Sequence, residues 1–241
     1  MAVKFLISLG TALVLFMSNT LHASVINGGE LLDGSGANFL EERLGLGSLD
    51  FTNISNLSRG ASTSVWHADV FGYTNVISIY DVIFQGNNYL IGGFSSIGHD
   101  GNSYSYNQTT TANNFIFNIS LGVIHNTQAM VWSGQYDQYD SNVYFATFGG
   151  GHDLFGGSYV LGNAGYINAS NSYNNGYSYG GSQHLLGSGV SGFQNIIING
   201  LESYTFAPSS ISAVNIPVPS TLAILGLGLL GAGFSRKKIT K

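Results

Sequence analysis

The sequence contains no cysteine, and it has almost no positive charge away from its two ends. No disulfide can therefore stabilise the chain, and its central part has to hold together by core packing alone. Between residues 24 and 210, two basic residues, Arg43 and Arg59, stand against all twelve acidic residues, which leaves a formal charge near −10. Nucleic acids and anionic membranes both need a basic patch on their protein partner, so the imbalance argues against either partner. Divalent cations and neutral glycans remain compatible with it.

The first 23 residues have the three-part order of a secretory signal peptide. Lys4 gives a positive start, the run from Phe5 to Met17 is apolar, and Leu21-His22-Ala23 ends on a small residue. The apolar run is short for a membrane span, and a buried helix that is apolar on every side would need a core all round it. We therefore predict export, with cleavage by signal peptidase after Ala23 and a mature chain that starts at Ser24.

Residues 24–210 are predicted to form one mainly β domain, because no long low-complexity linker and no fixed repeat divides them. Short aromatic and aliphatic runs are separated by Gly, Asn and Ser, which is typical of many short strands joined by turns. Phe115, Phe117 and Ile119 follow a period of two and are expected on one face of a strand. The same period recurs over residues 202–206.

Two further runs, Val76–Phe84 and Ile196–Ile198, are continuously apolar, as in strands that are covered on both faces. The one convincing helical pattern ahead of the C-terminal tail runs from Gly36 to Leu44, with Asn38 as a candidate N-cap and Glu41 at the N3 position. Together these patterns predict a mainly β, two-sheet antiparallel sandwich with one or two short flanking helices.

An ordered series of motifs runs from about residue 46 to residue 206. The motifs are Leu57-Ser58-Arg59-Gly60, Val65-Trp66-His67, Tyr89-Leu90-Ile91-Gly92-Gly93-Phe94, Asn114-Phe115-Ile116-Phe117, residues 147–154, Tyr177-Ser178-Tyr179-Gly180 and Gly200-Leu201-Glu202-Ser203-Tyr204. In this order they resemble the TLDc domain family, although Arg59 is followed directly by Gly60 where the family usually has an acidic residue between them. The resemblance implies a β-sandwich flanked by helices. It implies a protective role against oxidative damage in eukaryotic members, and no catalytic set to carry over.

A candidate binding turn follows Phe148. It consists of Gly149, Gly150, Gly151, His152 and Asp153. We expect Gly150 and Gly151 to take backbone conformations that a side chain disfavours, which places an imidazole and a carboxylate at the end of the turn. Such a pair could hold a metal or act as acid and base. The simpler interpretation is that the glycines allow tight packing while the two polar side chains bond nearby backbone groups.

Asp137 and Asp140 form the other candidate pair. Two carboxylates three residues apart, among aromatic residues, could bind calcium or line a glycan site, but a solvated turn is the simpler interpretation. The remaining histidines of residues 24–210 follow no ligand spacing and are expected at the surface or satisfied in the core: His67, His99, His125 and His184. We accordingly predict no catalytic residue, metal site or cofactor.

Residues 211–241 are predicted to be a sorting tail. A short proline-containing motif at 217–221 precedes an apolar helix at 222–234, and a basic end follows at 236–241. The prolines keep the motif extended and open to a protease, while the basic end stays cytoplasmic by the positive-inside rule. The residues assigned to the signal are Pro217, Pro219, Ser220, Thr221, Arg236, Lys237 and Lys238. This order resembles the PEP-CTERM sorting signal of bacteria, which implies processing by a membrane-embedded exosortase; Val218 stands where the family usually has Glu.

These predictions describe an exported surface or extracellular-matrix protein. We expect signal peptidase and exosortase as partners during export, transient insertion of the tail into the inner membrane, and matrix glycan as a ligand. A non-catalytic binding or building role is favoured over a secreted hydrolase or an oxidative-stress protective protein, because no catalytic signature is present.

The first testable prediction concerns the tail. Its apolar run of thirteen residues spans about 20 Å as a helix, against about 30 Å for the hydrocarbon core, so it suits a pause in the bilayer better than an anchor. Mass spectrometry of protein from the cell exterior should find a C-terminus within residues 216–221. Replacing Pro217 and Pro219 by alanine should leave uncut protein in the inner membrane. Recovery of intact chains through Lys241 from the exterior would contradict the sorting hypothesis.

Overall fold

The computed structural model describes residues 24–101, 105–107, 114–126, 137–168, 173 and 184–209. The predicted signal peptide and sorting tail lie outside these residues. The helical elements are α1 (Gly34–Leu44), α2 (Thr63–Val70) and the 3-10 turn η1 (Ile119–Leu121). The strands are β1 (Val25–Asn27), β2 (Leu49–Ser58), β3 (Val76–Phe84), β4 (Asn87–Ser95), β5 (Ser105–Asn107), β6 (Phe115–Asn118), β7 (Val123–Asn126), β8 (Gln138–Asp140), β9 (Thr147–Phe148), β10 (Leu154–Phe155), β11 (Gly165–Asn168) and β12 (Phe193–Pro208).

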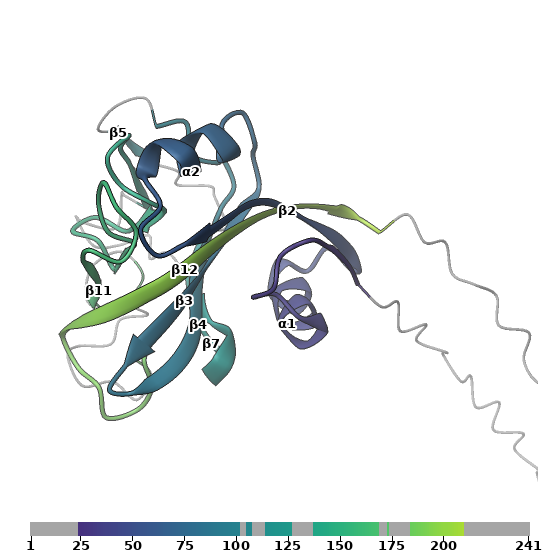
Figure 1. The fold of residues 1–241 in the computed structure, drawn as a ribbon. Coiled ribbons are helices and arrows are strands. Elements are labelled where there is room, and N and C mark those ends of the chain that lie inside the picture. Colours follow the sequence, from purple (N-terminus) through teal and green to yellow (C-terminus); the bar gives the residue numbers. More distant parts are fainter. Residues whose placement is uncertain are drawn as a thin grey trace, which may run out of the picture. The chain divides into compact units, whose positions relative to one another are not determined.

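Strand β12 connects the two groups of strands. Its first residues, 193–196, pair with β11, while residues 197–204 pair with β3 on one edge and residues 200–208 pair with β2 on the other. Figure 1 shows β12 as the long yellow-green strand beside β3. The series β5-β8-β9-β10-β11-β12-β3-β4-β6-β7 is antiparallel throughout, and β1 adds to β2 in parallel. The mainly β, antiparallel prediction is therefore confirmed. Hydrogen bonds join the described strands into one continuous sheet, so the strand pairing alone does not establish two separate sheets. The two-sheet sandwich therefore stays a prediction.

Helix α1 begins two residues earlier than predicted. Asp33 is its N-cap, and the carboxylate of Asp33 accepts a hydrogen bond of 2.8 Å from the Gly36 amide. The prediction of Asn38 as N-cap is wrong, because Asn38 lies inside the helix. The helix ends at Gly45, whose φ of 67° is a left-handed conformation that glycine adopts readily. Glu41 does not complete a capping box; its carboxylate accepts hydrogen bonds from the Ser24 hydroxyl and the Leu49 amide.

The second helix, α2, has no amphipathic signal strong enough to predict it from sequence. It is only eight residues long, and it is positioned by one large side chain, Trp66, which is 1% exposed. The indole Nε1–H of Trp66 donates to the Ser203 hydroxyl at 3.0 Å, and Ser203 is in turn bonded to Ser78 at 3.1 Å. This buried chain of hydroxyls ties α2 to β12 and β3 without leaving a polar atom of the indole unsatisfied.

The central strands have apolar cores on both faces. One core holds α1 against the sheet, and it includes Leu40 together with Ile77 and Ile79 of β3. The other core includes Tyr80 and Val82 of the same strand, and it also takes in side chains of α2, of residues between Phe145 and Ile167, and of Tyr173. The expectation that β3 is covered on both faces is therefore confirmed, since alternate residues of one strand enter different cores.

Two other strand predictions are correct only in part. Phe115 and Phe117 share one buried face of β6, but Ile119 has already left the strand for η1, although it still packs against the same core. In β12, Ile196 and Ile198 are buried and Ile197 is 48% exposed, so this stretch is covered on one face and not on two.

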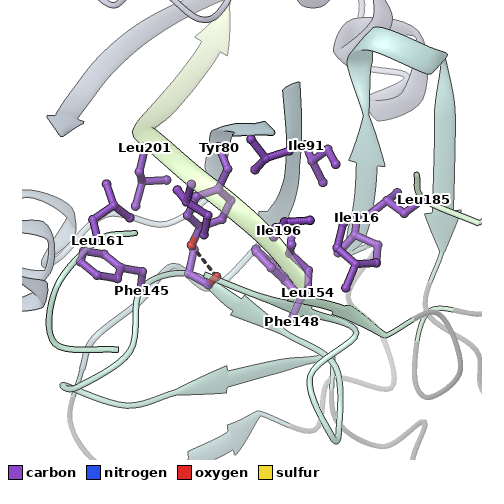
Figure 2. Packing of buried hydrophobic residues seen from close by; sticks show 14 of the residues in the cluster. Tyr80, Ile91, Ile116, Phe145, Phe148, Leu154, Leu161, Leu185, Ile196 and Leu201 are labelled. Atoms are coloured by element: carbon purple, nitrogen blue, oxygen red, sulfur yellow. Dashed lines mark hydrogen bonds between the residues drawn. The ribbon is translucent and has the colours of Figure 1, made fainter. Parts of the chain in front are cut away.

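Residues 145–148 contribute to this second core and contact the central strands at two points. The hydroxyl of Tyr80, in β3, donates a 2.7 Å hydrogen bond to the carbonyl of Ala146, which is the dashed line in Figure 2. Burial raises the pKa of Tyr80, so the phenol keeps its proton. Next to it, Phe148 of β9 packs on Gly93 of β4, where a Cβ atom would lie only 2.5 Å from the phenyl ring.

This close approach generates the second prediction. Gly93→Ala should lower the free energy of unfolding by about 1–3 kcal/mol, because the methyl group would displace Phe148 from a core that has no spare volume. Chemical denaturation followed by circular dichroism measures this change. Gly200→Ala is the matched control: its Cβ would meet nothing closer than 3.4 Å, so stability should change by less than about 1 kcal/mol. Equal effects of the two substitutions would contradict the packing argument.

Candidate functional site

The predicted glycine turn connects β9 to β10 in a hairpin, in which Phe148 pairs with Leu154. The amide of His152 donates to the carbonyl of Gly149 at 3.1 Å, which closes the turn. Gly151 has a φ of 81°, as expected, but the second strained glycine is Gly149, at 89°, and not Gly150. At Gly149 a Cβ atom would also lie 2.1 Å from the Asp153 carboxylate. Both the positive φ and this close contact therefore disfavour a side chain at this position.

His152 and Asp153 occupy different environments. Asp153 is 1% exposed and lies against Gly149 inside the hairpin. His152 is half-buried, and its own φ of 61° is rare for a residue with a side chain. Its Nδ1 atom lies 2.9 Å from the Tyr166 hydroxyl, within hydrogen-bond distance. The turn therefore presents the imidazole and encloses the carboxylate, so a ligand would meet His152 alone.

His152 belongs to a connected row of rings that we call the aromatic strip. Its six members come from β8, β10, β11, β12 and the loops between them: Tyr139, Tyr144, His152, Phe155, Tyr166 and Phe193. The rings of His152 and Phe155 are stacked, with centroids 5.3 Å apart and planes 14° apart. Phe155 contacts Tyr166 at 4.9 Å, and Tyr166 contacts Phe193 at 4.5 Å.

Exposure is graded within the aromatic strip. Tyr139 and Phe155 are 9% and 8% exposed and form its base. Tyr144, His152 and Tyr166 are half-buried, and Phe193 is 52% exposed. Sequence analysis finds only His152 of this set, because the rings are drawn from residues 139 to 193. The alternation in Gly165–Asn168, with Tyr166 between two buried positions, is the local signal that could have indicated another outward-facing ring.

The pair Asp137 and Asp140 is not a solvated turn, which corrects the interpretation favoured from sequence. Each side chain is 2% exposed, because β8 is paired with both β5 and β9. The amide nitrogen of Asn114 donates to Asp137 at 2.9 Å, and the backbone amide of Asp100 donates to Asp140 at 2.9 Å. A glycan could not reach carboxylates enclosed in this way.

Asp140 also faces His99, whose Nδ1 lies 3.8 Å from a carboxylate oxygen. Burial raises the pKa of Asp140, but the interactions with His99 and Asp100 outweigh it and lower the pKa to about 2. Trp66 lies between this histidine and His67, with ring centroids at 5.0 and 4.7 Å. His67 and His99, which are far apart in the sequence, therefore lie near each other around Trp66. His99 is only 2% exposed, so it is closed to a ligand.

The other histidines mainly serve the backbone. Nε2 of His67 lies 2.9 Å from the carbonyls of Ser141 and Tyr144, so it carries the proton and donates to both. His184 accepts from the Leu186 amide through Nδ1 and contacts the Gly192 carbonyl through Nε2, as expected of a satisfied core histidine. Within the described part of the chain, no three His, Cys, Asp or Glu side chains are grouped so as to hold a metal ion.

Comparison with known proteins identifies the tail. Residues 215–237 match the family described as the PEP-CTERM protein-sorting motif. This match confirms the sorting prediction, since it includes the proline motif, the apolar run and the start of the basic end. The chain is thus an exported protein that is directed to the cell surface and sorted by an exosortase. A comparison with curated proteins finds no match.

The remaining sequence predictions are not tested by this match. The resemblance to the TLDc family and the signal peptide at 1–23 stay predictions. In the described residues no helix has the length and apolar character needed to cross a membrane, and the predicted apolar helix at 222–234 lies outside them.

The third prediction concerns the stability of the fold at acidic pH. Burial lowers the pKa of His67, His152 and His184 below the usual value of 6.5. Below pH 6.5 the unfolded chain therefore binds more protons than the folded chain. The contribution of these residues to the free energy of unfolding is fully present above that pH and is lost as the pH falls. Urea unfolding should give a lower stability at pH 5.5 than at pH 7.5. The contribution of Asp140 is lost separately, between pH 3.8 and about 2.

A matched variant tests the assignment. His152→Asn removes one titrating group and keeps a residue that tolerates positive φ. The loss of ring contacts should lower stability at both pH values. Because the variant also lacks a group whose pKa folding lowers, the net loss should be larger at pH 7.5, and the difference between pH 7.5 and pH 5.5 should become smaller. A wild-type stability that is constant or rises on acidification would contradict the prediction.

Proposed function

We propose that the chain is a non-catalytic component of the extracellular matrix that acts by binding glycan. The observation that carries the proposal is the aromatic strip, which offers a surface of partly exposed rings beside the one imidazole that the glycine turn presents. Rings with polar tips suit ligands that have both apolar faces and hydroxyl groups. The sorting motif supports the location, because it directs the chain out of the cell.

The non-catalytic part of the proposal is supported by burial. His99 faces the carboxylate of Asp140 within ion-pair distance, and neither side chain is more than 2% exposed. A general acid or base has to come within hydrogen-bond reach of its substrate. His152 is open to a ligand, but the adjacent carboxylate of Asp153 is enclosed and cannot act beside it.

Two finer features belong to the same proposal. We propose that the domain is a TLDc-like two-sheet sandwich, and the position of β12 between the two groups of strands is compatible with this. The tail holds the chain at the inner membrane briefly through residues 222–234, and exosortase then cleaves it, so that the domain reaches the cell surface or the matrix. Both features agree with the order of motifs in the sequence and await direct tests.

The fourth prediction tests the function. Protein purified from the cell exterior should cosediment with insoluble matrix polysaccharide isolated from the same cells, and it should release no new reducing ends during prolonged incubation. Release of reducing ends would favour the alternative of a secreted hydrolase. Failure to cosediment, with no turnover, would remove glycan binding and leave a protective protein as the surviving alternative, which a peroxide survival assay on cells lacking the protein would address.

A further inference from the structure

The outward face of the β10-β11-β12 region carries no formal charge. Side chains alternate along each strand, so Phe193, Asn195 and Ile197 share one side of β12, and the three are exposed. In register with them, Tyr166 lies opposite Asn195, and Phe155 lies opposite Tyr166. Two rings and one uncharged amide therefore lie side by side across neighbouring strands.

Neither arginine of the described residues contacts a ring of the aromatic strip, although Arg59 lies at the end of the β11-β12 pair, where its amide donates to the Asn199 carbonyl. Arg43, on α1, lies over the ring of Phe115 at 4.6 Å and donates to the Asn126 side chain through Nε at 3.0 Å. Arg59 contacts the carbonyl of Gly162. Recognition of a uronate, sulfate or phosphate group normally uses such a guanidinium, bound directly to the anion. The strip has none, and the formal charge near −10 of residues 24–210 repels anions at longer range.

From these observations we infer that the aromatic strip binds a neutral polysaccharide chain, with sugar rings stacked on Tyr166 and Phe193 and with hydrogen bonds to Asn195 and His152. The inference rests on the proposed function and specifies its ligand. The rings are held in place by the hairpin below them, since Phe155 is 8% exposed and stacks on His152, so binding does not have to order a mobile surface.

The test uses the exported protein as purified from the cell exterior. Isothermal titration calorimetry measures binding of three neutral hexasaccharides, cellohexaose, laminarihexaose and maltohexaose, and of one anionic hexasaccharide, hexagalacturonate. Variants Phe193→Ala and Tyr166→Ala remove the two outer rings, and Tyr166→Phe keeps the ring but removes its hydroxyl. The matched control is Phe71→Ala, because Phe71 is 64% exposed and has no ring contact with the strip. Thermal unfolding of each variant establishes that it is folded.

We expect at least one neutral hexasaccharide to bind and hexagalacturonate to bind more weakly. Phe193→Ala and Tyr166→Ala should each weaken binding about tenfold, in the range of one lost stacking contact. Tyr166→Phe should lose less, and Phe71→Ala should not differ from wild type. Phe193→Ala is the decisive variant if Tyr166→Ala does not fold, since Phe193 is the most exposed ring of the strip.

The outcomes separate this inference from the function on which it rests. If wild type and Phe193→Ala cosediment equally with matrix polysaccharide, the strip is not the contact surface, and the proposed function stands. Preference for hexagalacturonate, or binding to none of the neutral hexasaccharides by protein that does cosediment with matrix, would also overturn the inference. If the wild-type protein does not cosediment at all, the proposed function itself fails.

Discussion

The hydrogen bond from the Tyr80 hydroxyl to the Ala146 carbonyl is the interaction on which the candidate site depends. It joins the middle of the central sheet to the segment that leads into β9, and Phe148 on Gly93 fixes the same segment one step further along. The hairpin of β9 and β10 is therefore held at its base by core contacts, and its glycine turn projects from a rigid support. This buried bond helps to position the outward rings, because Phe155 lies in the hairpin itself, opposite Thr147.

The parts of the fold that could be predicted are those specified by neighbours in sequence. Val76–Phe84 forms one strand in which Ile77 and Ile79 enter one apolar core and Tyr80, Val82 and Phe84 enter the other, and the continuous apolar run in the sequence indicates both. Helix α1 was predicted over nearly its full length, but its start was not, since the Asp33 cap lies ahead of a glycine-rich first turn with little helical propensity. The length of β12 could not be foreseen, because Gly200 and the two register shifts on either side of it divide the strand into patterns that look separate.

In the candidate site too, only features specified by neighbouring residues in the sequence could be predicted. The turn at 149–153 is contiguous, so the strained glycine at 151 and the presented His152 could be expected from sequence. The burial of Asp137 and Asp140 depends on a strand pairing between segments far apart in the sequence, and polar residues in a short run carry no sign of it. The sorting motif is the opposite case: it is recognised as a linear segment, and sequence alone therefore sufficed to find it.

The position of β12 has a consequence for biogenesis. This strand pairs with β2, β3 and β11 and is the last strand of the described chain, ending at Pro208, while the sorting motif begins at residue 215. The sheet cannot close until the end of the domain has been synthesised, since its connecting strand is made after all its partners. A chain cut short during synthesis would lose both its connecting strand and its address. Completion of the fold and eligibility for sorting are thereby limited to the same full-length molecules.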